Sequence, residues 1–203
     1  MLVRDVMTAD PVTVRTDTSV RTALELLDRH SITTLPVLSP AGLLVGAIGE
    51  ADLIREAVRP DARAHAIPSQ AAPRTRAPRR VVEVMNHRTV TVRADTDLAI
   101  AADLMTDTGV KSLPVIDEHH RVVGMVSRRD IIHMLARRDT MIEAEVDAIF
   151  HELGVDWLAE VQDGVVMVTG PENAQDRALA ETAAGTVPGV VAVNVIYTPA
   201  PRR

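Results

Sequence analysis

Two seven-residue segments of the sequence end in an aspartate that could bind a sugar. GMVSRRD, residues 124–130, has a counterpart in GAIGEAD, residues 46–52. Both begin with glycine, end with an aspartate (Asp130 or Asp52) and lead into a predicted helix. A carboxylate can accept hydrogen bonds from the 2′- and 3′-hydroxyls of a ribose. The two segments therefore indicate a pair of candidate nucleotide sites.

The residues before each aspartate differ, and the difference favours the second segment as a phosphate site. A hydroxyl at a helix start, beside free backbone N–H groups, suits a phosphate, and Ser127 supplies one. Arg128 and Arg129 follow it in the first turn. In the first segment Gly49 lacks the hydroxyl, and Glu50 would repel a phosphate. We expect the main site in the second segment. The weaker site in the first segment is either empty or takes a different ligand, such as a nucleoside.

Helix capping explains the same residues without a ligand. Ser127 at the N-cap and Asp130 three residues later match a capping box, in which each side chain accepts the other residue's backbone N–H. In the first segment, Gly49 is a permissive N-cap. From these turns alone, capping and ligand binding are equally good explanations, and both stay open.

The sequence between the two segments reveals an internal repeat. A shift of 78 positions aligns residues 3–59 with a second copy without a gap. Short β-branched runs such as PVTV and TVTV predict strands, and each copy predicts the order strand, helix, strand, strand, helix. The first helix begins with capping residues and places on one face Val20, Ala23, Leu24 and Leu27. A copy of about 55 residues buries only part of a core, so each copy should need the other.

The C-terminal part of the chain follows a different pattern. A helix is predicted with Ile142, Val146, Ile149 and Leu153 along one side. Two strands turn at Asp163-Gly164, a strong hairpin signal, and a second helix and a final strand follow. Phe150 and Trp157 are predicted to be core or interface residues of this part and not a cofactor site. The order helix, strand, strand, helix, strand indicates a separate unit.

Composition limits the classes of function. The net charge of −6 and an aromatic content of 1% argue against binding of single-stranded nucleic acid, and the chain has no cysteine. No apolar run approaches the length of a membrane span, and acids and a proline interrupt the N-terminal MLVRDVMTADPV, unlike a signal peptide. We expect a cytoplasmic protein, which could also associate with the inner membrane face.

No set of residues predicts catalysis or a metal site. The histidines are scattered, without a serine, cysteine or carboxylate arrangement that would make a triad. His119 and His120 are adjacent on a predicted turn, where two residues rarely chelate one metal. We therefore expect no enzyme activity and no metal.

Residues 60–80 form a linker rich in proline and arginine. Such a segment cannot pack, so we expect a solubilising tether between the two copies. Its positive charge leaves a second hypothesis open, a regulator that binds nucleic acid through Arg74, Arg76, Arg79 and Arg80.

The repeated motifs resemble a tandem pair of CBS domains. The matching pieces are the opening VMT (VMN in the second copy), the TV…DT strand and turn, the LPV strand and the closing glycine-to-aspartate turn, over residues 2–59 and again over 81–138. In residues 139–198, DGVVMVTG and VPGVVAVNV resemble a BON domain. The resemblance implies an α+β protein with two β-α-β-β-α repeats packed as a pseudo-twofold module and a small α-β-β-α-β BON-like domain. The expected domains are 1–59, the linker 60–80, 81–138 and 139–198.

This resemblance also implies where ligands bind, because paired CBS domains commonly bind adenosine nucleotides or related ligands. AMP, ADP, ATP and S-adenosylmethionine are the expected regulatory ligands. In such pairs the closing turn of one copy faces the opening strand and the residues before the proline of the other. The main site would then comprise Val12, Ile32, Thr33, Thr34, Ser127, Arg128, Arg129 and Asp130. The weaker site would comprise Gly49, Asp52, Val90, Val110, Lys111 and Ser112, with Lys111 as its cation.

Together these features predict a non-catalytic sensor that binds an adenosine nucleotide between its repeats and signals through the BON-like domain. The alternative is a structural module with vacant CBS sites, whose BON-like domain binds phospholipid or a protein partner. CBS pairs usually form flat dimers through their helices, so we also expect a homodimer. Its surface would come from the aliphatic residues Ala23, Leu26, Leu27, Ala101, Leu104 and Met105.

Overall fold

A computed structural model describes residues 1–57 and 78–196 of the chain. The chain divides into two compact units. The first, here called the repeat unit, holds the described residues of Met7–Ala94 together with Asp103–Val126. The second, here called the terminal unit, combines Met1–Val6 and Asp95–Ala102 with the described residues from Ser127 onward, 127–196. Each unit is described separately.

Both copies of the repeat contain the expected helix, two strands and second helix. The elements of the first copy are η1 (Val3–Asp5), β1 (Thr8–Ala9), β2 (Val14–Arg15), α1 (Val20–His30), β3 (Thr34–Leu38), β4 (Leu44–Gly49) and α2 (Glu50–Ala57). Those of the second copy are η2 (Val81–Glu83), α3 (Leu98–Thr108), β5 (Ser112–Ile116), β6 (Val122–Ser127) and α4 (Arg128–Leu135). This mixed α+β arrangement agrees with the predicted fold class.

The opening strand of each copy is shorter than predicted. In the first copy only β2 remains, parallel to β3, and in the second copy one bridge joins Val92 to Val115. After β2 the Thr16 N–H still donates to the Leu38 carbonyl oxygen at 3.2 Å, and the chain then turns toward α1, where the Thr18 hydroxyl accepts the backbone N–H of Arg15 at 3.0 Å.

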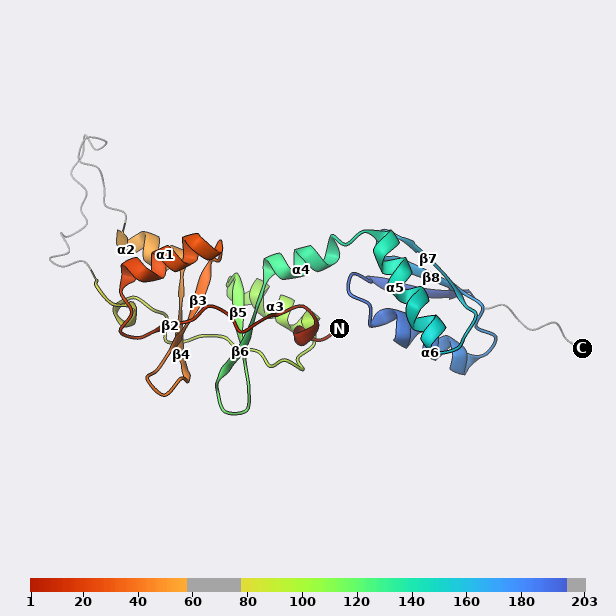
Figure 1. The fold of residues 1–203 in the computed structure, drawn as a ribbon, viewed down its shortest axis with the longest axis horizontal. Helices are drawn as coiled ribbons and strands as arrows, with labels where there is room; N and C mark the ends of the chain where they lie inside the picture. The colour runs from red at the N-terminus through yellow and green to blue at the C-terminus, as the bar shows by residue number, and fades with distance from the viewer. Residues whose placement is uncertain (58–77, 197–203) are drawn as a thin grey trace, which may run out of the picture. The chain divides into compact units, whose positions relative to one another are not determined.

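Helix α1 starts and packs as predicted. The Ser19 side chain accepts the backbone N–H of Thr22 at 2.9 Å and caps the helix. Ala23 and Leu27 are buried in the core of the first copy, with Val20 and Leu24 packed against it. Helices α1 and α2 cover one face of the β2-β3-β4 sheet (Figure 1).

The surface predicted for a homodimer is wrong for most of its residues. Ala23, Leu27, Ala101 and Met105 are buried within the chain itself. These small and aliphatic residues point inward because an amphipathic helix turns its apolar stripe to its own core. A side chain already in the core cannot contact a second molecule. Dimerisation remains a prediction that would need other residues.

An exchange of short segments joins the two copies within the repeat unit. Strand β1 of the first copy pairs with β6 of the second, in register Thr8↔Met125. The equivalent bridge joins Asn86 of the second copy to Ala47 in β4. The sequence predicted no strand at β1, which has only two residues and no alternating pattern. The exchange agrees with the expectation that each copy needs the other.

The exchange places a packing constraint on the glycine that begins each of the two segments 46–52 and 124–130. A Cβ at Gly46 would lie 2.7 Å from the Asn86 carbonyl oxygen, and a Cβ at Gly124 would lie 2.5 Å from Met7 Sδ. A side chain at Gly46 would displace the exchanged backbone, whereas at Gly124 the closest atom is the end of the flexible Met7 side chain and the Thr8 carbonyl oxygen would lie 3.2 Å away. Close packing therefore disfavours a side chain at both positions, most strongly at Gly46, independently of any ligand.

Most of the predicted linker, including Arg74 and Arg76, lies outside the described residues. Its last two residues, Arg79 and Arg80, make backbone pairs with the first copy. The Arg79 carbonyl accepts the Val20 N–H at 3.0 Å, and Arg80 bridges to Ser19. These backbone pairs place the start of the second copy against the start of α1.

The C-terminal segment has the predicted α-β-β-α-β order. Its elements are α5 (Asp139–Glu152), β7 (Leu158–Gln162), β8 (Val165–Thr169), α6 (Ala174–Gly185) and β9 (Ala192–Ile196). Strands β7 and β8 are antiparallel, whereas β8 and β9 are parallel. Helices α5 and α6 share a core with one face of this sheet (Figure 1). The hairpin turns at Asp163-Gly164, where both residues have positive φ, as predicted.

The core of this segment differs from the prediction at one residue. Ile142, Val146 and Phe150 are buried, Ile149 packs against them, and Leu153 is 46% exposed. Leu153 lies outside the core because it is the C-cap, after which the chain turns at Gly154 with φ of 71°. The Trp157 ring meets Phe150 edge-on at 5.3 Å, so both aromatic residues belong to this core as predicted.

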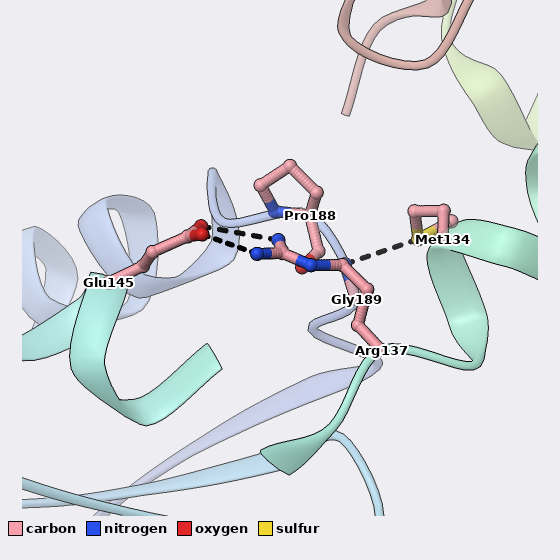
Figure 2. Close-up of polar contacts among 5 residues, drawn as sticks. All are labelled: Met134, Arg137, Glu145, Pro188 and Gly189. Atoms are coloured by element: carbon pink, nitrogen blue, oxygen red, sulfur yellow. Dashed lines mark hydrogen bonds and ion pairs between the residues drawn. The ribbon is translucent and has the colours of Figure 1, made fainter. Parts of the chain in front are cut away.

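An arginine joins α4 to the C-terminal segment inside the terminal unit (Figure 2). Arg137, in the short connection between α4 and α5, donates to the Pro188 carbonyl oxygen at 2.6 Å and pairs with Glu145 through both terminal nitrogens. Beside it, the Gly189 N–H donates to Met134 Sδ at 3.2 Å. We call these contacts the Arg137 clamp. The sequence pattern did not predict it.

Candidate functional site

A pocket of about 250 Å³ lies in the repeat unit beside Asp52. Its volume is slightly below the range of about 300–1,000 Å³ typical of small-molecule sites. Both copies of the repeat contribute to its wall. The lining residues are Thr33, Thr34, Ala47, Gly49, Glu50, Ala51, Asp52, Asn86, Arg88, Thr89, Val90, Gly109, Val110, Lys111 and Ser112. All six residues predicted for the weaker site are among them.

The first copy contributes the junction between β4 and α2. The Glu50 N–H donates to the Thr33 carbonyl oxygen at 2.9 Å and ties the helix start to the residue before β3. The Gly49 N–H donates to Asp52 Oδ2 at 3.1 Å. Asp52 therefore does act as a helix cap. Its other oxygen, Oδ1, accepts no hydrogen bond from the part of the chain that the structure describes.

The second copy contributes two segments to the opposite wall. One is its opening loop, in which Asn86 accepts the Arg88 N–H through Oδ1 at 2.9 Å and the Thr89 hydroxyl through its carbonyl at 3.3 Å. The other leads from α3 into β5, where Gly109 adopts a φ of 72° that favours glycine. Val90 and Val110 are half-buried and supply apolar surface for a flat ring.

Two opposite charges of the pocket wall are paired across the two copies. The Lys111 ammonium donates to Glu50 Oε1, and these side chains are 59% and 37% exposed. Lys111 was predicted to be the cation available to a ligand, but it already has an acidic partner. Arg88 is a second cation on the wall that sequence reasoning missed. The repeat gave little indication of this residue, because the position equivalent to Arg88 in the first copy is occupied by Asp10.

The residues of the predicted main site belong to both compact units. Ser127, Arg128, Arg129 and Asp130 start α4 in the terminal unit, whereas the other predicted residues belong to the repeat unit. Val12 and Ile32 pack against the core of the first copy. Thr33 and Thr34 line the pocket beside Asp52.

The start of α4 forms the capping box that the sequence allowed. Asp130 Oδ2 accepts the Ser127 N–H at 2.8 Å and the Ser127 hydroxyl at 2.7 Å, and the Asp130 N–H donates to Ser127 Oγ at 3.3 Å. This geometry fully explains why serine and aspartate occur at these two positions. The capping interpretation is confirmed here, and ligand binding at Asp130 stays a prediction.

Two features are absent from the described residues 1–57 and 78–196. These residues contain no group of three or more histidine, cysteine or acidic side chains that could hold a metal ion. None of the helices in these ranges is both long and apolar enough to cross a membrane.

Known proteins share the repeated half of this chain. The family model for the CBS domain matches residues 3–59 and 81–137. The magnesium transporter MgtE of Thermus thermophilus is 34% identical over 170 residues, which cover 81% of this chain and 31% of the transporter. This chain therefore spans about a third of the length of that relative.

Solved structures agree with the family match. A CBS domain pair in complex with 5′-methylthioadenosine and S-adenosyl-L-methionine superposes with a TM-score of 0.54 and 27% identity, over 66% of this chain and 94% of that one. The structure of CBSX2 in complex with AMP gives a TM-score of 0.51 and 27% identity, over 65% of this chain and 93% of that one. With its two matched repeats and this shared fold, the chain belongs to the CBS domain family.

Proposed function

We propose that this protein is a non-catalytic regulatory protein that binds an adenosine-type ligand in the pocket beside Asp52. One observation carries the proposal. Segments of both copies wall a single pocket, and a carboxylate on that wall has an oxygen without a hydrogen bond from the described chain. The solved complexes of CBS pairs with AMP and with S-adenosyl-L-methionine support the same class of ligand.

The wall offers a suitable group for each part of a nucleoside. Asp52 Oδ1 would accept a ribose hydroxyl, while Oδ2 keeps the start of α2 in place. Val90 and Val110 would hold the purine, and the backbone near Thr34 and Ser112 would pair with its edge. None of these groups is arranged as a nucleophile with a base, which favours binding over catalysis.

The turn at Asp130 remains a second candidate site. Its first turn carries two arginines, which suit a phosphate better than Glu50 and Ala51 do in the first copy. The capping box already uses Ser127 and one oxygen of Asp130. We therefore place the pocket beside Asp52 first, reversing the order predicted from the sequence.

The C-terminal segment would report the ligand to a partner. Its resemblance to a BON domain suggests a phospholipid or a protein as that partner. The Arg137 clamp gives a physical route within the terminal unit, since it fastens the end of α4 to the loop at Pro188 and Gly189 (Figure 2). A displacement of α4 would be passed to this loop instead of being absorbed by a flexible connection.

The two repeats provide a matched pair of variants for testing the site. Asp52→Asn removes the charge but keeps an oxygen that can accept the Gly49 N–H, and Asp130→Asn makes the same change in the other turn. Calorimetry on the full chain with adenosine, AMP and S-adenosylmethionine should show at least about tenfold weaker binding for Asp52→Asn, because hydrogen bonds to a charged group contribute about 1.5–3 kcal/mol.

The other outcomes are equally clear. Weakening by Asp130→Asn alone would move the site to the second turn. The absence of heat or thermal stabilisation at millimolar ligand would favour the alternative of vacant CBS sites, with the C-terminal segment as the binding part.

A further inference from the structure

The ion pair between Glu50 and Lys111 makes the pocket beside Asp52 different from an ordinary phosphate site. Both side chains line the pocket, and they come from different copies of the repeat. Lys111 is therefore not a free positive charge waiting for an anion. An incoming phosphate would have to compete with a carboxylate for this ammonium.

The start of α2 is also poorly suited to an anion. Helix starts attract phosphates because their first backbone N–H groups have no partner within the helix. Here the Gly49 N–H donates to Asp52 Oδ2 at 3.1 Å, and the Glu50 N–H donates to the Thr33 carbonyl oxygen at 2.9 Å. A phosphate at this turn would meet two carboxylates and find these two donors occupied.

The equivalent positions in the other copy provide an internal comparison. Glu50 aligns with Arg128, and Lys111 aligns with Thr33. The two turns thus share the aspartate that could grip a sugar but carry opposite charges beside it. The difference points to discrimination at the group attached to the sugar, with the sugar and the base recognised alike.

We infer that the Glu50–Lys111 pair makes the pocket beside Asp52 select adenosine ligands without a 5′-phosphate over those that carry one. The inference rests on the proposed function, because it assumes that a nucleoside occupies this pocket. Glu50 is the residue that sets the preference. It repels a phosphate directly and also neutralises Lys111, which is one of the two cations on the wall, the other being Arg88.

Adenosine and AMP differ only in the 5′-phosphate and form the matched ligands for the test. Their affinities are measured by calorimetry for the full chain and for the variants Glu50→Gln and Lys111→Gln. Each is also measured in an Asp130→Asn background, so that AMP bound at the second candidate site does not contribute. Glu25→Gln is the control, since it removes the same charge from an exposed pair with Arg21 on α1, away from the pocket.

We expect the unmodified chain to bind adenosine about tenfold more tightly than AMP, a ratio that corresponds to about 1.4 kcal/mol. Glu50→Gln should lower the ratio of adenosine affinity to AMP affinity about tenfold, and Lys111→Gln should raise this ratio. Glu25→Gln, away from the pocket, should change neither affinity. Adenosine binding that is still measurable shows that the pocket of each variant is folded.

The results that overturn the inference differ from those that overturn the proposed function. Tighter binding of AMP than of adenosine by the unmodified chain, or a ratio that Glu50→Gln does not move, refutes selection by the ion pair while the pocket remains a nucleoside site. Binding of neither ligand at millimolar concentration refutes the proposed function and the inference together.

Discussion

Replacing Arg137 by alanine tests whether the connection between α4 and the C-terminal segment is rigid. The Arg137 side chain is only 20% exposed and bonds to a carbonyl 51 residues away in sequence. The substitution removes the donor to Pro188 and leaves Glu145 without its partner (Figure 2). The other clamp residues cannot replace the guanidinium, because Met134 contributes only its sulfur, and Pro188 and Gly189 contribute only backbone groups.

The expected loss of stability follows from two contributions. A hydrogen bond from a charged donor contributes about 1.5–3 kcal/mol, and the Pro188 carbonyl is partly buried. The ion pair with Glu145 is worth at most about 1 kcal/mol, because the Glu145 side chain is 47% exposed and solvent screens the charges. We expect Arg137→Ala to lower the free energy of unfolding of the terminal unit by about 2 kcal/mol.

Urea unfolding followed by tryptophan fluorescence measures this change directly. The chain contains one tryptophan, Trp157, which packs against Phe150 in the core of the terminal unit. For a small unit with an m-value of about 1–2 kcal/mol/M, the midpoint should fall by about 1–2 M. Arg137→Lys should recover part of the loss, because a lysine keeps the charge but not the paired geometry.

The matched control is Arg177→Ala in the same unit. Arg177 pairs with Glu181 at 2.8 Å on the exposed surface of α6, an arrangement worth about 0.3–0.5 kcal/mol. The reasoning is refuted if Arg137→Ala shifts the midpoint no further than Arg177→Ala does. The clamp would then contribute no more to the free energy of unfolding than an exposed ion pair does.

Three further predictions follow from single positions. Gly189→Ala should destabilise the terminal unit by at least about 1 kcal/mol, because Gly189 has a φ of 98° and its Cβ would lie 2.8 Å from Ile142 Cδ1; an unchanged urea midpoint would contradict this. Gly49→Ser should fit, since its Cβ would lie 3.5 Å from Asp52 Oδ2, and it should raise both AMP affinity and the melting temperature slightly; equal affinity in calorimetry would count against the asymmetry between the two turns. The backbone N–H groups of Arg121 and His119 donate to the Asp117 carboxylate and hold its pKa below the usual value. These hydrogen bonds therefore stabilise the fold at neutral pH, and this contribution is lost as the pH falls through the lowered pKa. An NMR titration that places the pKa of the Asp117 carboxyl at or above the usual value would refute this prediction.

The patterns that predicted structure well were those set by a few neighbouring residues. The cap at Ser19, the buried face of α1 and the turn at Asp163-Gly164 all depend on backbone geometry within about one turn of chain. The prediction that Leu153 lies on the apolar face of its helix was wrong, because helical periodicity does not indicate where a helix ends. The two-residue strand β1 was missed because its partner, β6, lies more than a hundred residues away.

The candidate site was predictable in its members but not in their pairing. Repetition of the sequence singled out Gly49 and Asp52, the resemblance to paired CBS domains added Lys111, and the pocket wall contains all three. It did not indicate that Lys111 would meet Glu50 across 61 positions, or that Arg88 would join the wall. It also could not distinguish an apolar helix face that packs inward, such as Ala23 and Leu27, from one that binds another molecule.

Duplication, helix starts and the order of elements could thus be read from the chain itself, because local backbone constraints and periodic burial encode them. The charge that each ligand group would meet, and the route from α4 to the C-terminal segment, depend on distant segments coming together. Arg137 and Pro188, like Glu50 and Lys111, are ordinary residues in sequence and acquire a role only as neighbours in space. Folding determines these neighbours because burial of the whole core, and not any local pattern, selects which segments pack against one another.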